Sequence, residues 1–327
     1  MPVGVVNHWS EREEGGNRFW LEFIRWAILN VGRRFARLAM GPTALYFLIR
    51  RGPERRASRD WLRRHPDTAA GLRGPLRHIH TFAMTIVDRV LLLSGRTDEL
   101  DIRAEGNTAV HESLAQGRGC LLLGSHLGSF EAVRVLSRDL PGTRLRVVMD
   151  RNQNALMTRL LESLDPGIAA TVIDAGRPGT EIVLEISRTL EEGQMAAMLA
   201  DRVHRREPSI RVPFMGQPAA FPVSPFLIAS LSRVPVFLVF GLFEGSNRYR
   251  LVFECLTERM NIDRRNRQRD LEYWVGRYAT RLEHYAREYP YNWFNFYDFW
   301  NSSTTGSPAN DSRHPAGTAR DGSGRPG

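Results

Sequence analysis

The sequence predicts an α/β fold in which a mixed central sheet is covered by helices and preceded by helices that associate with a membrane. The chain of 327 residues, 42% of them hydrophobic, is long enough for a large buried core. Helical periodicity extends to about residue 95, after which short apolar runs alternate with helix-like stretches. We therefore expect a basic, helical, membrane-associating region at 1–95, an α/β domain at 96–300 and a disordered tail at 301–327.

The N-terminal region is expected to lie on a membrane surface rather than to cross the membrane. Residues 1–100 hold 17 of the arginines against 10 acidic residues, so most of the net charge of +9 is here, and an anionic partner surface is favoured. The longest uncharged stretch, Leu38–Ile49, is shorter than the roughly 20 apolar residues of a spanning helix. The residues that suit a membrane interface are Trp20, Trp26, Tyr46 and the basic run Arg50–Arg64. The alternative is an ordinary pair of packed helices.

Six apolar runs are predicted as strands of the sheet, because turn residues or helix-like stretches bound each of them. They are 120–124, 146–149, 171–173, 195–199, 236–240 and 250–256. A long helix is expected at about 264–288, and the N-terminal helices are expected to break at Gly52-Pro53, Pro66 and Gly74-Pro75. From Asn301 onward the chain is rich in Ser, Gly and Pro without apolar periodicity, which is typical of disorder.

The candidate site follows the strand at 120–124, where GSHLGSFE leads into a helical pattern. Strand ends that turn into helices are where α/β proteins place ligands and reactive groups. His126 and Glu131 are five positions apart, which is about 140° around an ideal helix. They can therefore meet only if His126 lies in the turn and Glu131 in the first helical turn.

Small residues around His126 favour this arrangement. Gly124 and Gly128 would permit a tight turn. A serine, Ser125 or Ser129, could cap the helix, whose N-terminus would favour negative charge that develops nearby.

A carboxylate bonded to one imidazole nitrogen fixes the tautomer and makes the other nitrogen a better base. Such a pair can remove a proton from a hydroxyl as that hydroxyl attacks an acyl group. The structural alternative is a histidine that only forms a hydrogen bond at a strand end.

The segment GRGCLLLGSHLGSFE resembles the H-x4-D/E block of the lysophospholipid acyltransferase superfamily, especially its bacterial lipid A late acyltransferase branch and the related predicted acyltransferases of aryl polyene pathways. The N-terminal HWSEREEGGNRFWLEFIRWAILNVGRR, ADR (200–202), VPFMGQPAAFP (212–222) and YPYNWFNFYDFW (289–300) are also similar to that subgroup, so the resemblance covers about 7–300. Lipid A enzymes tend to end in a Trp-containing segment with basic residues, whereas YNWFNFYDFW has none.

The resemblance implies a glycerol-3-phosphate acyltransferase-like fold and an O-acyltransferase at the cytoplasmic face of the bacterial inner membrane. His126 would be the general base and Glu131 its partner. An acyl thioester, commonly that of acyl carrier protein, would be the donor, and a hydroxyl of a membrane lipid or glycolipid would be the acceptor. It implies no cofactor, metal or covalent enzyme intermediate.

Other polar residues also follow predicted strands. Asp201 and Arg202 follow the run at 195–199 and should emerge near the same sheet edge, where Arg202 could bind a phosphate or carboxylate and Asp201 could hold an acceptor hydroxyl or orient Arg202. Arg151 is a second candidate for anion binding. An ion pair at a strand end is the structural alternative. The aromatic residues of 289–300 could line an acyl channel, lie at the membrane interface or form a terminal segment stitched over the sheet.

Two other function classes compete with acyl transfer. A thioesterase or lipid hydrolase could use the same pair, although histidine at the centre of GSHLG leaves no serine nucleophile there. A module that binds nucleic acid is disfavoured, because the chain lacks RNP-like aromatics, zinc-ligand spacing and a recognisable helix-turn-helix. Cys120 and Cys255 lie in apolar runs and are expected to be reduced and buried. No secretory signal precedes the helices, so we expect the chain to remain cytoplasmic.

Overall fold

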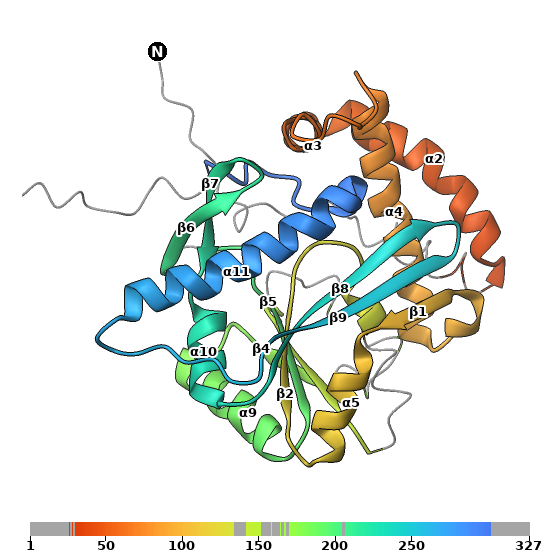
Figure 1. The fold of residues 1–327 in the computed structure, drawn as a ribbon. Helices are drawn as coiled ribbons and strands as arrows, with labels where there is room; N and C mark the ends of the chain where they lie inside the picture. Colours follow the sequence, from red (N-terminus) through yellow and green to blue (C-terminus); the bar gives the residue numbers. More distant parts are fainter. Residues whose placement is uncertain are drawn as a thin grey trace, which may run out of the picture.

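The computed structural model describes residues 30–133, 142–151, 170–204 and 207–301, together with five single residues, 26, 28, 158, 164 and 167. A seven-stranded sheet lies at the centre of the described fold (Figure 1). Its strands are β1 (Asp101–Glu105), β2 (Cys120–Gly124), β3 (Leu145–Met149), β4 (Val172–Asp174), β5 (Met195–Leu199), β8 (Val236–Gly245) and β9 (Arg248–Thr257). The six predicted runs are all strands of this sheet, which confirms the predicted fold class.

The strand order is β1-β9-β8-β2-β5-β3-β4, and the sheet is mixed. The strands β8, β2, β5, β3 and β4 run parallel to one another, while β8 and β9 form an antiparallel hairpin. The edge strand β1, with the sequence DIRAE, is not predicted, because its exposed, mostly polar residues give no apolar run. The parallel part matters most for the site, since the carboxyl ends of its strands meet at one edge.

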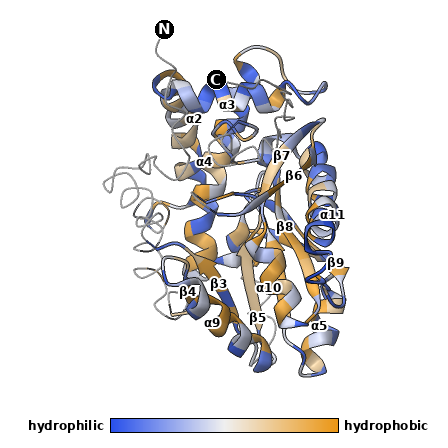
Figure 2. Cartoon of the chain, turned by 90° about the vertical axis from the view of Figure 1, so that its left-hand side faces the viewer, coloured by the Kyte–Doolittle hydropathy of each residue, from blue (hydrophilic) through white to orange (hydrophobic). Residues whose placement is uncertain are grey.

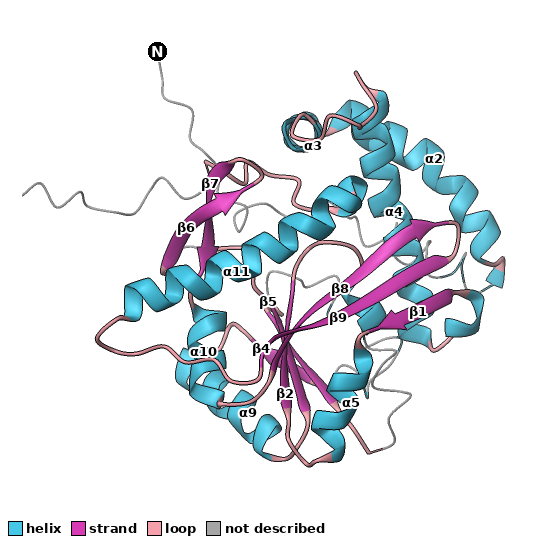
Figure 3. Cartoon of the chain, in the orientation of Figure 1, coloured by secondary structure: helices cyan, strands magenta, loops and turns pink. Residues whose placement is uncertain are grey.

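Helices cover both faces of the sheet (Figure 3). They are α2 (Arg33–Arg50), α3 (Gly52–Leu62), α4 (Arg73–Ser94), α5 (Asn107–Ala115), α9 (Gly179–Glu191), α10 (Ser224–Ser232) and α11 (Arg267–Glu288), with short 3-10 helices η2 (Thr97–Glu99), η3 (Phe130–Val133) and η4 (Pro290–Asn292). The predicted long helix is α11, and the predicted break at Gly52-Pro53 separates α2 from α3. The domain boundary expected near residue 95 falls between α4 and β1.

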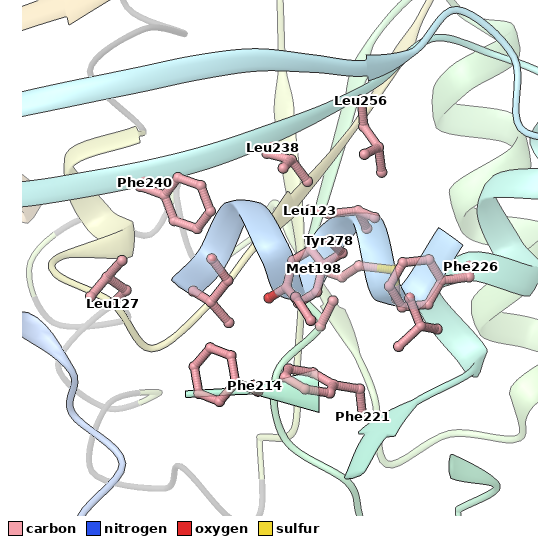
Figure 4. Packing of buried hydrophobic residues seen from close by; sticks show 14 of the residues in the cluster. Leu123, Leu127, Met198, Phe214, Phe221, Phe226, Leu238, Phe240, Leu256 and Tyr278 are labelled. Carbon is pink, nitrogen blue, oxygen red and sulfur yellow. The ribbon is translucent and has the colours of Figure 1, made fainter. Parts of the chain in front are cut away.

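Alternating side chains of β2 divide the core into two clusters. Leu121 and Leu123 pack with residues of α9, α10 and α11, whereas Cys120 and Leu122 pack with residues of α2, α4 and α5. Figure 4 shows the first cluster, in which Leu123 lies near Tyr278 of α11. In Figure 2 the central strands are hydrophobic between these layers, as expected for parallel strands buried on both faces. Each buried leucine contributes about 1.5–3 kcal/mol to folding.

A two-stranded hairpin, β6 (Ser209–Phe214) and β7 (Gln217–Pro222), extends the core beyond the main sheet. The turn predicted at Gly216 is confirmed, with Met215 and Gly216 both at positive φ. The flanking strands are not predicted, because the prolines within them are unusual in strands. The hairpin buries the Phe214 and Phe221 rings beneath the C-terminal aromatic residues.

The helix α2 is packed on one face and exposed on the other. Its Arg33 forms a bidentate ion pair with the buried Asp88 of α4, with Nε–Oδ1 and Nη2–Oδ2 distances of 2.7 and 2.8 Å. On the opposite face several large apolar side chains are exposed, among them Leu38 at 77% and Ile49 at 66%. Among the described helices, none combines the length and the apolar character needed to cross a bilayer. The predicted interfacial residue Trp20 and the tail from 302 onward lie outside the described residues.

Candidate active site

The carboxyl edge of the parallel strands brings the predicted site segments together. The register pairs Gly124 at the end of β2 with Leu199 at the end of β5, and the Ala200 N–H donates to Gly124 O at 3.0 Å. His126 and Asp201 each come two residues after this pair, so the register places them side by side. The expectation that Asp201 emerges at the same edge as the histidine block is therefore confirmed.

Asp201 holds His126 through three contacts. The imidazole Nδ1 lies 2.9 Å from Asp201 Oδ1 and 3.1 Å from Oδ2, and the His126 backbone N–H donates to Oδ2 at 3.0 Å. An ionised carboxylate can only accept, so Nδ1 carries the proton and Nε2 has the free lone pair. The Asp201 side chain is fully buried, whereas that of His126 is 26% exposed. Within the described part of the chain, Nε2 has no hydrogen-bond partner and is available as a base.

Glu131 does not occupy the position expected for it. Its Oε2 lies 3.0 Å from Nε of Arg89 on α4, and the Ser129 hydroxyl donates to the same oxygen at 3.5 Å. Between the described residues His126 and Glu131 the structure has no hydrogen bond. The expected orientation of the imidazole by Glu131 is thus corrected, because Asp201 occupies Nδ1 and Arg89 binds the Glu131 carboxylate.

Gly128 and Ser129 build the turn, and their backbone N–H groups are already bonded. Gly128 has φ +78°, and a Cβ there would lie 2.0 Å from the carbonyl oxygen of Gly241 on β8. The Gly128 N–H donates to Asn292 O at 2.8 Å, and the Ser129 N–H donates to Gly241 O at 2.7 Å. The substrate-binding role expected for these two residues is corrected, since both donors are used to fix the turn. Only glycine fits at Gly128.

Arg202 also has a different place from the one expected. Its Nε donates to Asn295 Oδ1 at 2.6 Å and its Nη2 donates to Phe294 O at 3.1 Å, while its guanidinium lies 5.7 Å from the Tyr297 ring centre. The guanidinium therefore binds the C-terminal segment. The expected capture of a substrate anion by Arg202 is replaced by an internal contact.

Arg151 follows β3, two strands from β2 along the same edge. Its backbone N–H donates to Asp174 Oδ1 at 3.3 Å, at the end of β4. The predicted position at the strand end is confirmed, and anion binding by Arg151 stays a prediction.

Charges around the imidazole set its protonation. Burial, followed by the positive charge of Arg202, lowers the pKa of His126, although Asp201 opposes both. Burial disfavours ionisation of Asp201, but the charge and hydrogen bond of His126, together with Arg202 and Asn295, outweigh it and lower the pKa of Asp201 to about 2. At neutral pH the site therefore pairs an ionised carboxylate with a neutral imidazole, the form that can accept a proton.

The closing segment, residues 289–300, lies over the His126 turn, defined as residues 125–129. The Phe294 N–H donates to His126 O at 2.8 Å, and Leu127 and Trp293 form an antiparallel bridge. Most of the aromatic side chains of the segment are buried, so it is a terminal segment stitched over the sheet. Sequence reasoning missed Asn295, which is buried although its place among aromatic residues suggested a wet edge.

The fold and the site define a class: an α/β protein with a carboxylate-held histidine at the carboxyl edge of its parallel strands. The family model of bacterial lipid A biosynthesis acyltransferases matches residues 17–302. The chain belongs to this family, and it is an acyltransferase of lipid metabolism that acts on a lipid acceptor. Enzymes of the family act at the inner membrane. No curated protein matches the chain in a sequence search.

Proposed function

We propose that the protein transfers a fatty acyl group from acyl carrier protein to a hydroxyl of a membrane lipid or glycolipid, with His126 as general base. The observation that carries the proposal is the His126–Asp201 contact, which leaves Nε2 partly exposed at the sheet edge. The aryl polyene subtype is part of this proposal, and its support is the closing segment without basic residues.

The reaction follows from the state of the imidazole. Nε2 takes the proton of the acceptor hydroxyl as its oxygen attacks the thioester carbonyl carbon. The tetrahedral intermediate then collapses, the carbon–sulfur bond breaks, and the proton on Nε2 passes to the leaving thiolate. Asp201 stabilises the imidazolium between these steps and returns to the same ion pair at the end. The products are an ester and a free thiol.

Glu131 enters the proposal through its partner Arg89 rather than through Nδ1. The pair lies beside the turn, and the positive charge of Arg89 contributes to lowering the pKa of His126. A neutral imidazole at working pH is the form that the proposed chemistry needs.

The test uses the purified full chain with an acyl thioester of acyl carrier protein and a lipid extract, and mass spectrometry detects the ester. We expect His126→Ala to lower the rate about 10²–10⁴-fold with an unchanged fold. Full transfer by folded His126→Ala would refute the assignment. Release of free fatty acid at the same rate with and without lipid would instead favour a thioesterase.

The exposed face of α2 supports binding to an anionic membrane surface. Its apolar residues are flanked by arginines, of which Arg34 and Arg50 are exposed. The exposed apolar side chains are Phe35, Leu38, Leu45, Tyr46 and Ile49. Apolar side chains beside cationic ones suit the boundary between acyl chains and anionic headgroups.

Vesicle sedimentation tests this surface. Leu38→Glu combined with Ile49→Glu should lower binding to phosphatidylglycerol vesicles at least about tenfold, because each apolar side chain contributes roughly 1.5–3 kcal/mol when buried. Leu231→Glu on α10 is the matched control, since Leu231 is 69% exposed and lies at the opposite end of the molecule (Figure 1). Equal binding by the double variant and the control would exclude α2 as the docking face.

A further inference from the structure

Asn295 links the closing segment to the carboxylate that holds His126. It is only 3% exposed, and its Nδ2 donates to Asp201 Oδ2 at 2.9 Å. The same oxygen accepts the His126 backbone N–H at 3.0 Å. With Oδ2 engaged by two donors, Oδ1 is left to face Nδ1 of His126 at 2.9 Å.

Arg202 fixes which way the Asn295 amide points. A guanidinium can only donate, so its Nε at 2.6 Å requires the amide oxygen to face it. The amide nitrogen must then face Asp201. The order Arg202, Asn295, Asp201, His126 is therefore a chain of hydrogen bonds in which every donor and acceptor is determined by the next group.

The backbone of the same segment holds the other side of the turn. Asn292 O accepts from the Gly128 N–H and the Phe294 N–H donates to His126 O, both at 2.8 Å. His126 is thus held from both chain directions by residues that follow it by more than 160 positions.

We propose that Asn295 is a positioning residue for the acyl-transfer reaction, whose amide, directed by Arg202, holds the Asp201 carboxylate in the orientation that aligns His126. The inference rests on the proposed function of His126 as base. It assigns Arg202 to the positioning of this amide rather than to an anionic substrate.

The charged groups that face His126 and Asp201 set the sign of a pH test. Arg202 from the β5 end and Arg89 from α4 lower the pKa of His126, while Asp201 raises it. The Tyr278 and Tyr297 side chains of α11 and the closing segment are near Asp201, and burial raises the pKa of both phenols, so they stay neutral. A carboxylate at position 295 adds negative charge and must raise the pKa of His126.

The experiment measures kcat, KM and the pH dependence of kcat/KM for the full chain, with the acyl carrier protein thioester as donor and the lipid extract as acceptor. Asn295→Leu should lower kcat about 10–100-fold with little change in KM, the range found for outer-shell partners of reactive groups. Asn295→Asp should move the acid limb of the profile to higher pH by about one unit. Asn292→Leu is the matched control: Asn292 is also buried in the segment, but its side chain bonds only Phe243 N and O. It should lower stability and leave the acid limb in place.

Wild-type kcat in folded Asn295→Leu would overturn the inference. If that variant does not fold, the isosteric Asn295→Asp decides, and an acid limb that stays or moves to lower pH overturns the inference. Parallel assays of His126→Ala separate the two proposals: an active His126→Ala refutes the base itself, whereas an inactive one with unaffected Asn295 variants refutes only the positioning role.

Discussion

Replacement of Asp201 by asparagine should inactivate the enzyme by imposing the wrong imidazole tautomer. Oδ2 of Asp201 accepts two N–H groups, from the His126 backbone and from Asn295. An amide nitrogen at that position would face two donors, so the new NH₂ group must take the Oδ1 position, 2.9 Å from Nδ1. It would donate to Nδ1, and the imidazole proton would move to Nε2, which could then no longer accept a proton.

The expected loss is large. In serine proteases, a comparable Asp-to-Asn change that fixes the wrong tautomer lowers kcat about 10⁴-fold, which corresponds to about 5 kcal/mol of transition-state stabilisation. We expect a similar loss in kcat for Asp201→Asn with KM nearly unchanged, measured by steady-state transfer from acyl carrier protein to the lipid extract.

Asp88→Asn is the matched control, because Asp88 is also a fully buried carboxylate, bonded to Arg33 and to the Tyr249 hydroxyl. It should lower the melting temperature and leave kcat of the folded protein unchanged. The reasoning would be refuted if Asp201→Asn kept kcat within tenfold of wild type while Glu131→Gln lost activity, since Glu131 would then be the partner of the base.

Three further predictions concern stability and reactivity. Gly128→Ala should lower the free energy of unfolding by more than about 3 kcal/mol in urea titrations, because its Cβ would meet Gly241 O, whereas Gly216→Ala, at a similar φ but with nothing within 4 Å, should cost only about 1 kcal/mol; equal losses would contradict the close approach. Burial lowers the pKa of His78 to about 4, so its contribution is fully present above pH 6.5 and is lost as the pH falls toward 4. Urea titrations should show about 2 kcal/mol lost between pH 7 and pH 5 through this group, and His78→Gln should remove that slope; an unchanged slope would refute it. A thiol reagent should modify Cys255, which is exposed, and spare Cys120, whose buried thiol has its pKa raised to about 12, so that one equivalent reacts in the native protein and two after denaturation.

The central strands could be predicted because parallel strands buried on both faces appear as continuous apolar runs. CLLLG and MAAML are such runs, and both are strands of the parallel part. The edge strand β1 and the β6–β7 hairpin have polar or proline-containing sequences, so their strand structure depends on partners far along the chain. The expectation that both cysteines are buried was wrong for Cys255, which lies at an exposed position of β9.

The base itself could be predicted, whereas its partners could not be fully assigned. His126 stands out because glycines flank it at a strand end. Its partner depends on sheet register, since Gly124 pairs with Leu199 and thereby places Asp201 opposite the histidine. The equal two-residue offset after each strand was a signal in the sequence, but it becomes informative only when the two strands are known to be neighbours. Asn295 gave no such signal, because its partners are brought to it by the course of the closing segment.

The crossing of the closing segment over the His126 turn has a consequence for biosynthesis. Asn292 and Asn295 follow every strand of the sheet in chain order, so a nascent chain can complete its sheet before it holds the histidine in place. The reactive imidazole would be aligned only as the final described residues dock. An unfinished polypeptide would thus be unable to consume activated fatty acids, and the enzyme would switch on as a last act of folding.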